Sequence, residues 1–390
     1  MSKQSIVIAS AVRTPMGGFQ GALKSVSAPQ LGAVAIKAAV ERARIDPAEV
    51  DEVIMGNVLP AGLGQAPARQ AALGAGVPET TGCTTINKVC GSGMKAAMLA
   101  HDLILTGTSR LMITGGMESM SNAPYLLPKA RGGLRLGHGE VKDHMFLDGL
   151  EDAYDPGRLM GTYAEETARE YGYTREAQDR YAIASLTRAQ DAIRSGRFRT
   201  EIAAVTTAKS VVEEDEQPLK ANVERIPQLK PAFRPDGTVT AANSSSISDG
   251  AAAMVLMTEH EAERRGLVPL ARIVGHATHA QAPARFTTAP IQAIRRLFDK
   301  IGWDAQSTDL FEINEAFAVV AMAAIDELRL APERVNVNGG ACALGHPLGA
   351  SGARIATNLV YTLRRRKARI GVGSACIGGG QGIAVVVEAV

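Results

Sequence analysis

The sequence predicts an α/β protein built from two similar halves with an insertion between them. Short apolar runs alternate with amphipathic helical patterns in the first third of the chain and again in the last third. Such alternation is typical of a mostly parallel sheet that helices cover on both faces. Both thirds also follow the order strand, glycine turn, helix, strand, glycine turn. We therefore expect a duplicated unit whose two copies meet at one site.

The first third contains four apolar runs of strand length and two patterns of helical spacing. In the first helical pattern, apolar residues such as Leu31, Val34 and Ala38 recur on one face. The predicted strands cover residues 5–10, 50–55, 84–89 and 110–114, and the predicted helices cover 29–42 and 92–106.

The middle of the chain differs, and we interpret residues 121–248 as an insertion whose loops cover a site. Proline, glycine, histidine and charged residues dominate 121–159 with weak periodicity. One long polar helix is predicted over 163–195, and a stretch with an acidic cluster and several prolines follows it. Loops of this length in compact proteins are usually functional or disordered.

The last third repeats the layout of the first. A predicted strand leads through glycines and His346 into a helix, as an earlier strand leads through Cys90 into its helix. The predicted strands cover 309–313, 335–338, 368–373 and 383–387, and a predicted helix begins at 351.

The composition is that of an ordinary globular protein. The 390 residues allow two or three domains, and the net charge of +2 gives no reason to expect nucleic acid as the main partner. No apolar stretch approaches a membrane span, and the N-terminal apolar run predicts a strand, not a signal peptide. The four cysteines predict neither a disulfide framework nor a zinc site, so we expect reduced thiols in a cytoplasmic protein.

Cys90 lies between a predicted strand and the start of a predicted helix. A helix N-terminus lowers the pKa of a thiol and supplies N–H donors, and Gly91 and Gly93 would let a substrate approach the backbone. This setting favours a nucleophilic thiolate. A small buried cysteine at a tight turn is an equally good interpretation of the residue alone.

His346 and Asn314 supply groups that could assist such a nucleophile. His346, in a glycine turn before a helix, can polarise a thiol or donate to an oxyanion, although a plain turn histidine is the simpler interpretation. Asn314 follows an apolar strand and can orient a water, or it can cap a helix that begins at Glu315. We interpret Glu315 itself as a structural residue.

Cys376 precedes three consecutive glycines. Such a run costs conformational entropy, which backbone N–H groups aimed at an oxyanion would justify. A tight hairpin before the final strand is the alternative. Because one cysteine and one histidine already make a nucleophile, the second cysteine suggests a separate proton-transfer task. Cys83 and Cys342 are interpreted as packing residues.

Together, the four motifs resemble those of the thiolase family. They are NKVCGSG around Cys90, NEAF at Asn314, GHP at His346 and CIGGG at Cys376. Segments 115–125 and 241–253 also resemble thiolase segments, so the resemblance covers essentially the whole chain, and its nearest branch is that of the acetyl-CoA acetyltransferases.

The resemblance implies a layered α/β/α/β/α fold with two duplicated core domains and an inserted loop domain. The implied boundaries are 1–119 plus 249–266 for the N-terminal core, 120–248 for the loop domain that covers coenzyme A, and 267–390 for the C-terminal core. It also implies a homotetramer, with the tetramerising loop in 121–139, that acts on acyl-CoA substrates and needs no other cofactor.

The implied reaction is the reversible condensation of two acetyl-CoA molecules to acetoacetyl-CoA and coenzyme A, by a ping-pong mechanism. Cys90 would carry the acetyl group, and Cys376 would act as acid and base. His346, which activates Cys90, would form one oxyanion hole with a water held by Asn314. The backbone N–H groups of Cys90 and Gly378 would form the other.

The family pattern also suggests binding residues for coenzyme A and for a possible potassium ion. Phe286 stands at an acyl-pocket position where some relatives have methionine, and Leu159 stands where many short-chain members have histidine. The implied coenzyme A and acyl contacts are Ser245, Leu150, Met160, Ala232, Phe233, Phe286 and Ala316. The implied potassium neighbours are Tyr181, Ala241, Ala242 and Ser244.

Three alternatives remain at this point. A thiolase of broader chain length, acting in fatty-acid β-oxidation, would share the same motifs. A decarboxylating ketosynthase uses one cysteine with histidine or asparagine partners, so Cys376 argues against it. A non-catalytic acyl-CoA or lipid-binding protein on the same scaffold would be expected to lose catalytic positions, and all are present.

Overall fold

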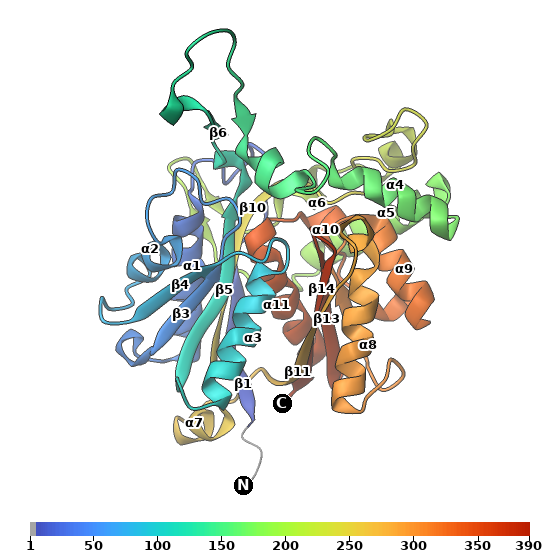
Figure 1. The fold of residues 1–390 in the computed structure, drawn as a ribbon. Coiled ribbons are helices and arrows are strands. Elements are labelled where there is room, and N and C mark those ends of the chain that lie inside the picture. Colours follow the sequence, from blue (N-terminus) through green and yellow to red (C-terminus); the bar gives the residue numbers. More distant parts are fainter. Residues whose placement is uncertain (1–4) are drawn as a thin grey trace.

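The computed structural model describes residues 5–390, and a ten-stranded mixed sheet runs through both halves of the chain (Figure 1). The strands follow one another in the order β4-β3-β5-β10-β1-β11-β14-β13-β12, and β2 pairs with β10 beside this path. Their bounds are β4 Gly82–Ile86, β3 Glu52–Gly56, β5 Leu111–Ser119, β10 Ser248–Thr258, β1 Ile6–Arg13, β11 Ala271–Ala280, β14 Gln381–Ala389, β13 Ile370–Ile377, β12 Leu310–Ile313 and β2 Gly17–Gly18.

The expected duplication is visible in how the strands pair. In the N-terminal half β3 is parallel to β4 and β5, while β10 is antiparallel to β5 and β1. In the C-terminal half β12 is parallel to β13, and β14 is antiparallel to β13 and β11. The predicted strand at 335–338 is reduced to one parallel bridge, from Val335 to Phe311. The two copies join where β1 pairs with β11.

The prediction of a mostly parallel sheet is wrong, because two strands in each half run against their neighbours. A parallel neighbour needs a long crossover, whereas a tight turn returns the chain antiparallel. Gly378, Gly379 and Gly380 form such a turn between β13 and β14. Gly379 and Gly380 have φ of 82° and 81°, which a residue with a side chain rarely adopts.

Helices cover both outer faces of the sheet and fill the space between its two halves (Figure 1). α1 and α2 cover the N-terminal half, α8 covers the C-terminal half, and α3 and α11 pack together in the middle, so the layers are α/β/α/β/α as expected. The helices of the two halves are α1 Ala28–Ala43, α2 Pro67–Gly74, α3 Ser92–Leu105, α7 Glu259–Arg264, α8 Ala289–Ile301, α9 Ala318–Leu328, α10 Ala341–Leu344 and α11 Leu348–Arg366, with short turns η1 Pro47–Glu49, η6 Pro283–Thr288 and η7 Pro332–Arg334.

The middle segment, which contains two longer helices and several short elements, lies over one end of the sheet (Figure 1). Its elements are η2 Met120–Asn122, β6 Tyr125–Leu126, η3 Ala130–Gly132, β7 Lys142–Asp143, η4 Phe146–Leu150, α4 Met160–Tyr171, α5 Arg175–Arg194, β8 Val205–Thr206, β9 Val211–Val212, α6 Glu216–Lys220 and η5 Val223–Gln228. The single helix predicted over 163–195 is wrong: Gly172, with φ of 68°, ends α4, and the Thr174 side chain caps α5. The boundaries of the loop domain stay a prediction.

Within residues 5–390 no helix has both the length and the apolar character that a membrane crossing requires. The last turn of α11 carries a basic run at 364–367 that is exposed to solvent.

Candidate active site

Cys90 lies in a strained turn between β4 and α3. Its neighbour Val89 has φ of 46°, a left-handed conformation that is rare for a β-branched residue. The Asn87 side chain accepts the Val89 N–H at 2.8 Å, and the Ser92 hydroxyl donates to the Val89 carbonyl at 2.7 Å. These bonds hold the strained residue, so the thiol beside it has a fixed position.

Cys376 lies near the end of β13 and close to Cys90. Its side chain is fully buried, and burial together with the charge of Cys90 raises the pKa of Cys376 well above its ordinary value. The backbone N–H of Gly378, in the turn that follows, hydrogen-bonds the Cys90 sulfur. The structure therefore brings the expected acid/base and one expected oxyanion donor to the expected nucleophile.

The expectation of a low pKa for Cys90 is wrong. Desolvation raises the pKa of the Cys90 thiol to about 11, although N–H groups of Gly378 and of Cys90 itself act in the opposite direction. The helix N-terminus and these donors are thus weaker than the cost of removing a thiolate from water. Cys90 is a thiol at rest and needs a base during the reaction.

Gly91 and Gly93 do not open a path for substrate, contrary to the expectation from sequence. A β-carbon on Gly91 would lie 2.5 Å from Ile377, and one on Gly93 would lie 2.8 Å from the backbone nitrogen of Ala353. These glycines let the start of α3 pack directly on the C-terminal half.

His346 lies in the turn before α11 and can serve as the required base. Its Nδ1 lies 2.5 Å from the Ser351 hydroxyl, which itself donates to the Pro347 carbonyl at 2.9 Å. The Ser351 hydroxyl uses its only proton in the bond to the Pro347 carbonyl, so it must accept a hydrogen bond from His346 Nδ1. Nδ1 therefore carries the ring hydrogen, and Nε2 offers a lone pair. Burial and the nearby Arg354 guanidinium lower the pKa of His346 to about 3, so the imidazole is neutral.

Asn314 follows β12 and points its amide at His346. The amide nitrogen lies 3.3 Å from His346 Nε2, and the Asn314 Oδ1 atom is buried with no partner among the described residues. The alternative of a helix cap is wrong, because α9 begins at Ala318 and Phe317 occupies its cap position. An unpartnered buried acceptor beside the histidine suits the expected water.

Glu315 ties the loops of the site to α5, which confirms its interpretation as structural. Its carboxylate accepts hydrogen bonds from the Tyr181 hydroxyl at 2.9 Å, the Ser185 hydroxyl at 2.8 Å, the Asn336 amide at 2.8 Å and the Cys342 N–H at 3.0 Å. Four donors on one buried carboxylate fix the loop that carries Asn314.

Comparison with known proteins agrees with this geometry. The thiolase N-terminal domain model matches residues 6–260, and the thiolase C-terminal domain model matches 267–389. The chain belongs to the thiolase family. It is 49% identical to an acetyl-CoA acetyltransferase of Schizosaccharomyces pombe over all of both chains, and 50% identical to acetyl-CoA acetyltransferase 2 of Arabidopsis thaliana, over 100% of this chain and 98% of the relative.

A solved structure supports the same assignment. A thiolase of Ascaris suum in complex with coenzyme A is 44% identical, with a TM-score of 0.95 over 99% of this chain and 100% of that one. The resemblance inferred from the four motifs, and the thiolase fold that it implied, are therefore confirmed.

Most of the expected binding residues of the thiolase belong to the two apolar clusters that include its cysteines Cys90 and Cys376. Met160, Phe233, Phe286 and Ala316 belong to the apolar cluster that contains Cys376. Leu150 packs in the smaller cluster that contains Cys90, and the Ser245 N–H donates to the Ala316 carbonyl at 2.9 Å. Ala232 lies beside Phe233 and bonds the Val239 carbonyl through its N–H. Their contacts with coenzyme A stay predictions.

The expected potassium neighbours are held by protein contacts. The Tyr181 hydroxyl donates to Glu315 and accepts from Asn336 at 3.1 Å, and the Ser244 hydroxyl donates to the Thr240 carbonyl at 2.7 Å. Ala241 and Ala242 line a surface cavity, and their methyl side chains have no atom that could bind an ion. Only backbone carbonyls and remaining lone pairs could serve potassium, and the ion stays a prediction.

Sequence reasoning missed two residues that support the site. Glu118, fully buried in β5, accepts hydrogen bonds from the N–H groups of Val58, Leu59 and Gly349 at 2.8 to 3.1 Å. Its charge also raises the pKa of Cys90, by less than desolvation does. Ser351 orients His346. The signals available were a carboxylate inside an apolar strand and a hydroxyl one turn beyond the histidine.

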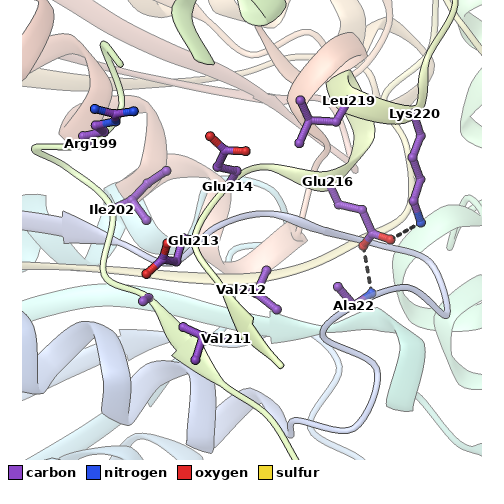
Figure 2. A pocket seen from close by; sticks show the side chains of 11 residues that line it. Ala22, Arg199, Ile202, Val211, Val212, Glu213, Glu214, Glu216, Leu219 and Lys220 are labelled. Atoms are coloured by element: carbon purple, nitrogen blue, oxygen red, sulfur yellow. Dashed lines mark hydrogen bonds and ion pairs between the residues drawn. The ribbon is translucent and has the colours of Figure 1, made fainter. Parts of the chain in front are cut away.

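A separate cavity of about 690 Å³ lies away from this chemistry (Figure 2). Glu213, Glu214 and Glu216 line it, and Glu216 pairs with Lys220 and accepts the Ala22 N–H. None of the described residues around it is cysteine, histidine or asparagine, so we do not assign the thiolase reaction to it.

Proposed function

We propose that this thiolase is an acetyl-CoA C-acetyltransferase, which condenses two acetyl-CoA molecules to acetoacetyl-CoA and coenzyme A and catalyses the reverse thiolysis. The observation that carries the proposal is the placement of two thiols together, with the Gly378 N–H on the Cys90 sulfur and Cys376 beside it. Relatives about half identical over the full chain carry the name acetyl-CoA acetyltransferase.

In the first half-reaction Cys90 Sγ attacks the carbonyl carbon of acetyl-CoA while its proton passes to His346 Nε2. The bond between that carbon and the coenzyme A sulfur then breaks, and the leaving thiolate takes the proton of Cys376. The acetyl group is left on Cys90, His346 is an imidazolium, and Cys376 is a thiolate. The proposed N–H donors of Cys90 and Gly378 stabilise the developing oxyanion.

In the second half-reaction the Cys376 thiolate removes a methyl proton from a second acetyl-CoA. The resulting enolate oxygen accepts the Nε2–H of the His346 imidazolium and a water on Asn314. The enolate carbon attacks the acetyl group, the bond to Cys90 breaks, and the Cys90 thiolate regains its proton from His346. Cys376 keeps the proton that it took from the methyl group, so both thiols and the imidazole return to their resting states.

Three aromatic rings favour a short acyl group over a long one. The Phe233 and Phe317 ring centroids lie 5.9 Å apart, and those of Phe286 and Phe317 lie 6.4 Å apart, both in edge-to-face geometry. Phe286 is buried and belongs to the cluster around Cys376. Closely packed rings leave little volume for an extended chain.

A kinetic series tests the acyl preference directly. Thiolysis of 3-ketoacyl-CoA substrates of increasing length is measured with coenzyme A, and a 2-methyl-branched substrate is included. We expect kcat/KM to be highest for acetoacetyl-CoA and to fall as the chain lengthens. Equal or rising kcat/KM with length would instead assign the enzyme to the broader class that serves fatty-acid β-oxidation.

The projecting segment 121–139 is the proposed tetramerising surface of a homotetramer. In Figure 1 the chain around β6 extends away from the body of the molecule. Tyr125, Leu134 and Leu136 are apolar and exposed, Leu136 by 99%, which is unusual for a surface that stays in water. Light scattering after size exclusion should give a tetramer, and Leu136→Asp should give dimers if the segment joins two dimers.

We also place the enzyme in the cytoplasm. The proposal rests on its chemistry, because Cys90 and Cys376 must stay reduced and all four cysteines are free. Fractionation of cells, with immunodetection of the protein in soluble and organelle fractions, tests it.

A further inference from the structure

Two histidines and an aspartate meet at the end of α3 that lies away from Cys90. His101 and Asp102 belong to the last turns of α3, and His276 belongs to β11 of the other half. Eleven residues separate Cys90 from His101, which is on the order of 16 Å along a helix axis. The cluster is therefore distinct from the thiol site.

The two histidine rings both contact one carboxylate oxygen of Asp102. His101 Nδ1 lies 3.0 Å and His276 Nε2 lies 2.9 Å from Asp102 Oδ1. The two imidazole rings stand edge to face at 88°, with centroids 5.1 Å apart, and the three ligand atoms lie within 4.8 Å of one another. A tetrahedral ion about 2.1 Å from each donor needs donors roughly 3.3 to 3.5 Å apart, so small side-chain movements suffice.

We propose that His101, Asp102 and His276 form a binding site for a divalent transition-metal ion such as Zn²⁺. Two neutral imidazoles and a carboxylate are ligands that Zn²⁺, Co²⁺ and Ni²⁺ accept, and water completes the coordination. On binding, each neutral imidazole moves its ring hydrogen, by exchange with solvent, from the nitrogen that faces Asp102 to its other nitrogen, and the freed lone pair binds the ion with no net release of protons.

Solvent can reach the cluster, and the charged groups beside it are Lys300, Arg272 and Glu388. The three residues line a surface cavity of about 540 Å³. Lys300 donates to the backbone carbonyl of His276 at 3.3 Å, and Arg272 is paired with Glu388 at 2.8 Å. Both histidine side chains are nearly buried, whereas the Asp102 side chain is 51% exposed, which leaves an entry path for a hydrated ion.

The location suggests a structural effect. β1 and β11 pair only over Ile6–Ile8 and Ala271–Ile273 among the described residues, and His276 lies three residues beyond that junction. An ion bound by α3 of one half and β11 of the other would link the two halves at a junction where only a few residue pairs of β1 and β11 connect them. Metal that binds only the folded chain raises its stability.

The test uses the full-length protein after dialysis against a chelator. Titration with CoCl₂ is followed by calorimetry and by visible absorption, and thermal unfolding is measured with and without ZnCl₂. We expect one Co²⁺ per chain, absorption typical of nitrogen and oxygen ligands, and a higher midpoint with Zn²⁺. Because Cys90 and Cys376 can also take metal, Cys90→Ala is titrated in parallel and should retain the Co²⁺ equivalent.

His101→Gln and Asp102→Asn should each weaken Co²⁺ binding by about tenfold or more and abolish the Zn²⁺-dependent rise in midpoint. Thiolysis should be unchanged in both, since neither residue belongs to the thiol site. The exposed histidine variant His260→Gln is the matched control and should bind as the parent does. Absence of a Co²⁺ equivalent, unchanged binding in both ligand variants, or sulfur-to-cobalt charge-transfer absorption that disappears in Cys90→Ala would overturn the proposal.

Discussion

The N-terminal and C-terminal halves place three side chains at matching positions of the same frame. In each half an amide follows a parallel strand, a second group stands two residues before the inner helix, and a third lies near the end of the neighbouring parallel strand. The matching pairs are Asn57 and Asn314, Cys90 and His346, and Glu118 and Cys376.

The halves differ in which of these groups remain available to a substrate. Glu118 is enclosed by backbone donors and by the Asn57 amide, which lies 2.6 Å away, so it holds loops together. Among the described residues, its counterpart Cys376 has a hydrogen bond only from its own backbone N–H, and it lies beside Cys90. In the proposed mechanism, one copy of the frame thus supplies the nucleophile and the structural residue Glu118, while the other supplies the base, the acid and the water site. Neither half is complete alone.

The largest expected effect is at the nucleophile. Cys90→Ala should reduce thiolysis of acetoacetyl-CoA by about 10⁴-fold or more, because no acetyl-enzyme can form. The assay follows loss of the acetoacetyl-CoA enolate absorbance. Cys83→Ala, at a partly buried thiol in β4, is the matched control and should keep activity. Retained activity in Cys90→Ala would remove the assigned asymmetry between the halves.

Cys376→Ser should separate the two half-reactions. Radiolabelled acetyl-CoA should still acetylate Cys90, while exchange of acetyl-CoA methyl protons with deuterated water should fall by about 10² to 10⁴-fold. The reason is that a serine hydroxyl is far less acidic than a thiol. Unchanged proton exchange would mean that Cys376 is not the base.

The two amides should respond differently to removal. Asn314→Ala should lower kcat by roughly 10 to 10²-fold, since the proposed water loses its anchor. Asn57→Ala should mainly lower the free energy of unfolding, because it leaves Glu118 with one donor fewer. Steady-state kinetics and urea unfolding are measured for both, and equal kinetic losses would show that the amides have the same task.

The high pKa of Cys90 predicts a distinctive pH dependence. With a pKa of about 11, only a small fraction is thiolate near neutral pH, so alkylation by iodoacetamide should rise about tenfold per pH unit between pH 7 and 10. Cys376→Ser is used so that Cys90 dominates the labelling, and mass spectrometry locates the adduct. A plateau below pH 8 would mean that Cys90 rests as a thiolate.

Glu118→Gln should have the smallest effect on chemistry and a clear effect on stability. Burial raises the pKa of Glu118 from 4.5 to about 7. The folded chain therefore binds more protons than the unfolded chain between these values, and its stabilisation by Glu118 protonation is lost as pH rises through 7. The free energy of unfolding of the variant should lack the pH-dependent contribution of Glu118, roughly 2 to 3 kcal/mol. The decrease in stability that Glu312 causes, with its pKa of about 8, should remain. Urea unfolding from pH 5 to 8 tests it.

Much of this organisation could be predicted from sequence, because it depends on local patterns. Strand and helix periodicities indicated the duplicated halves, and the four motifs indicated Cys90, Asn314, His346 and Cys376. What could not be predicted depends on chain segments that are distant in sequence. Desolvation of Cys90 results from packing against the other half. The four donors of Glu118 come from the segment after β3, 59 to 61 residues away, and from the start of α11, 231 residues away.

Strand direction could not be predicted from the sequence either, since an apolar run shows that a strand is buried but not in which direction it runs. The same is true of the break at Gly172, where one helical pattern continues through a residue that folds into a left-handed turn. In both cases the pattern correctly predicted which face is buried, but it did not predict where the chain turns or in which direction it continues.

The position of β1 has a consequence for how the protein is made. This first strand lies in the centre of the sheet and pairs with β10 and β11. Ile6 therefore cannot pair until Thr258 and Ile273 have been synthesised. At the usual rates of synthesis the ribosome needs roughly 10 to 50 seconds to supply those partners. During that interval an apolar strand has no neighbours, and long-range closure is intrinsically slow. The nascent chain should therefore depend on chaperones until the centre of the sheet can close.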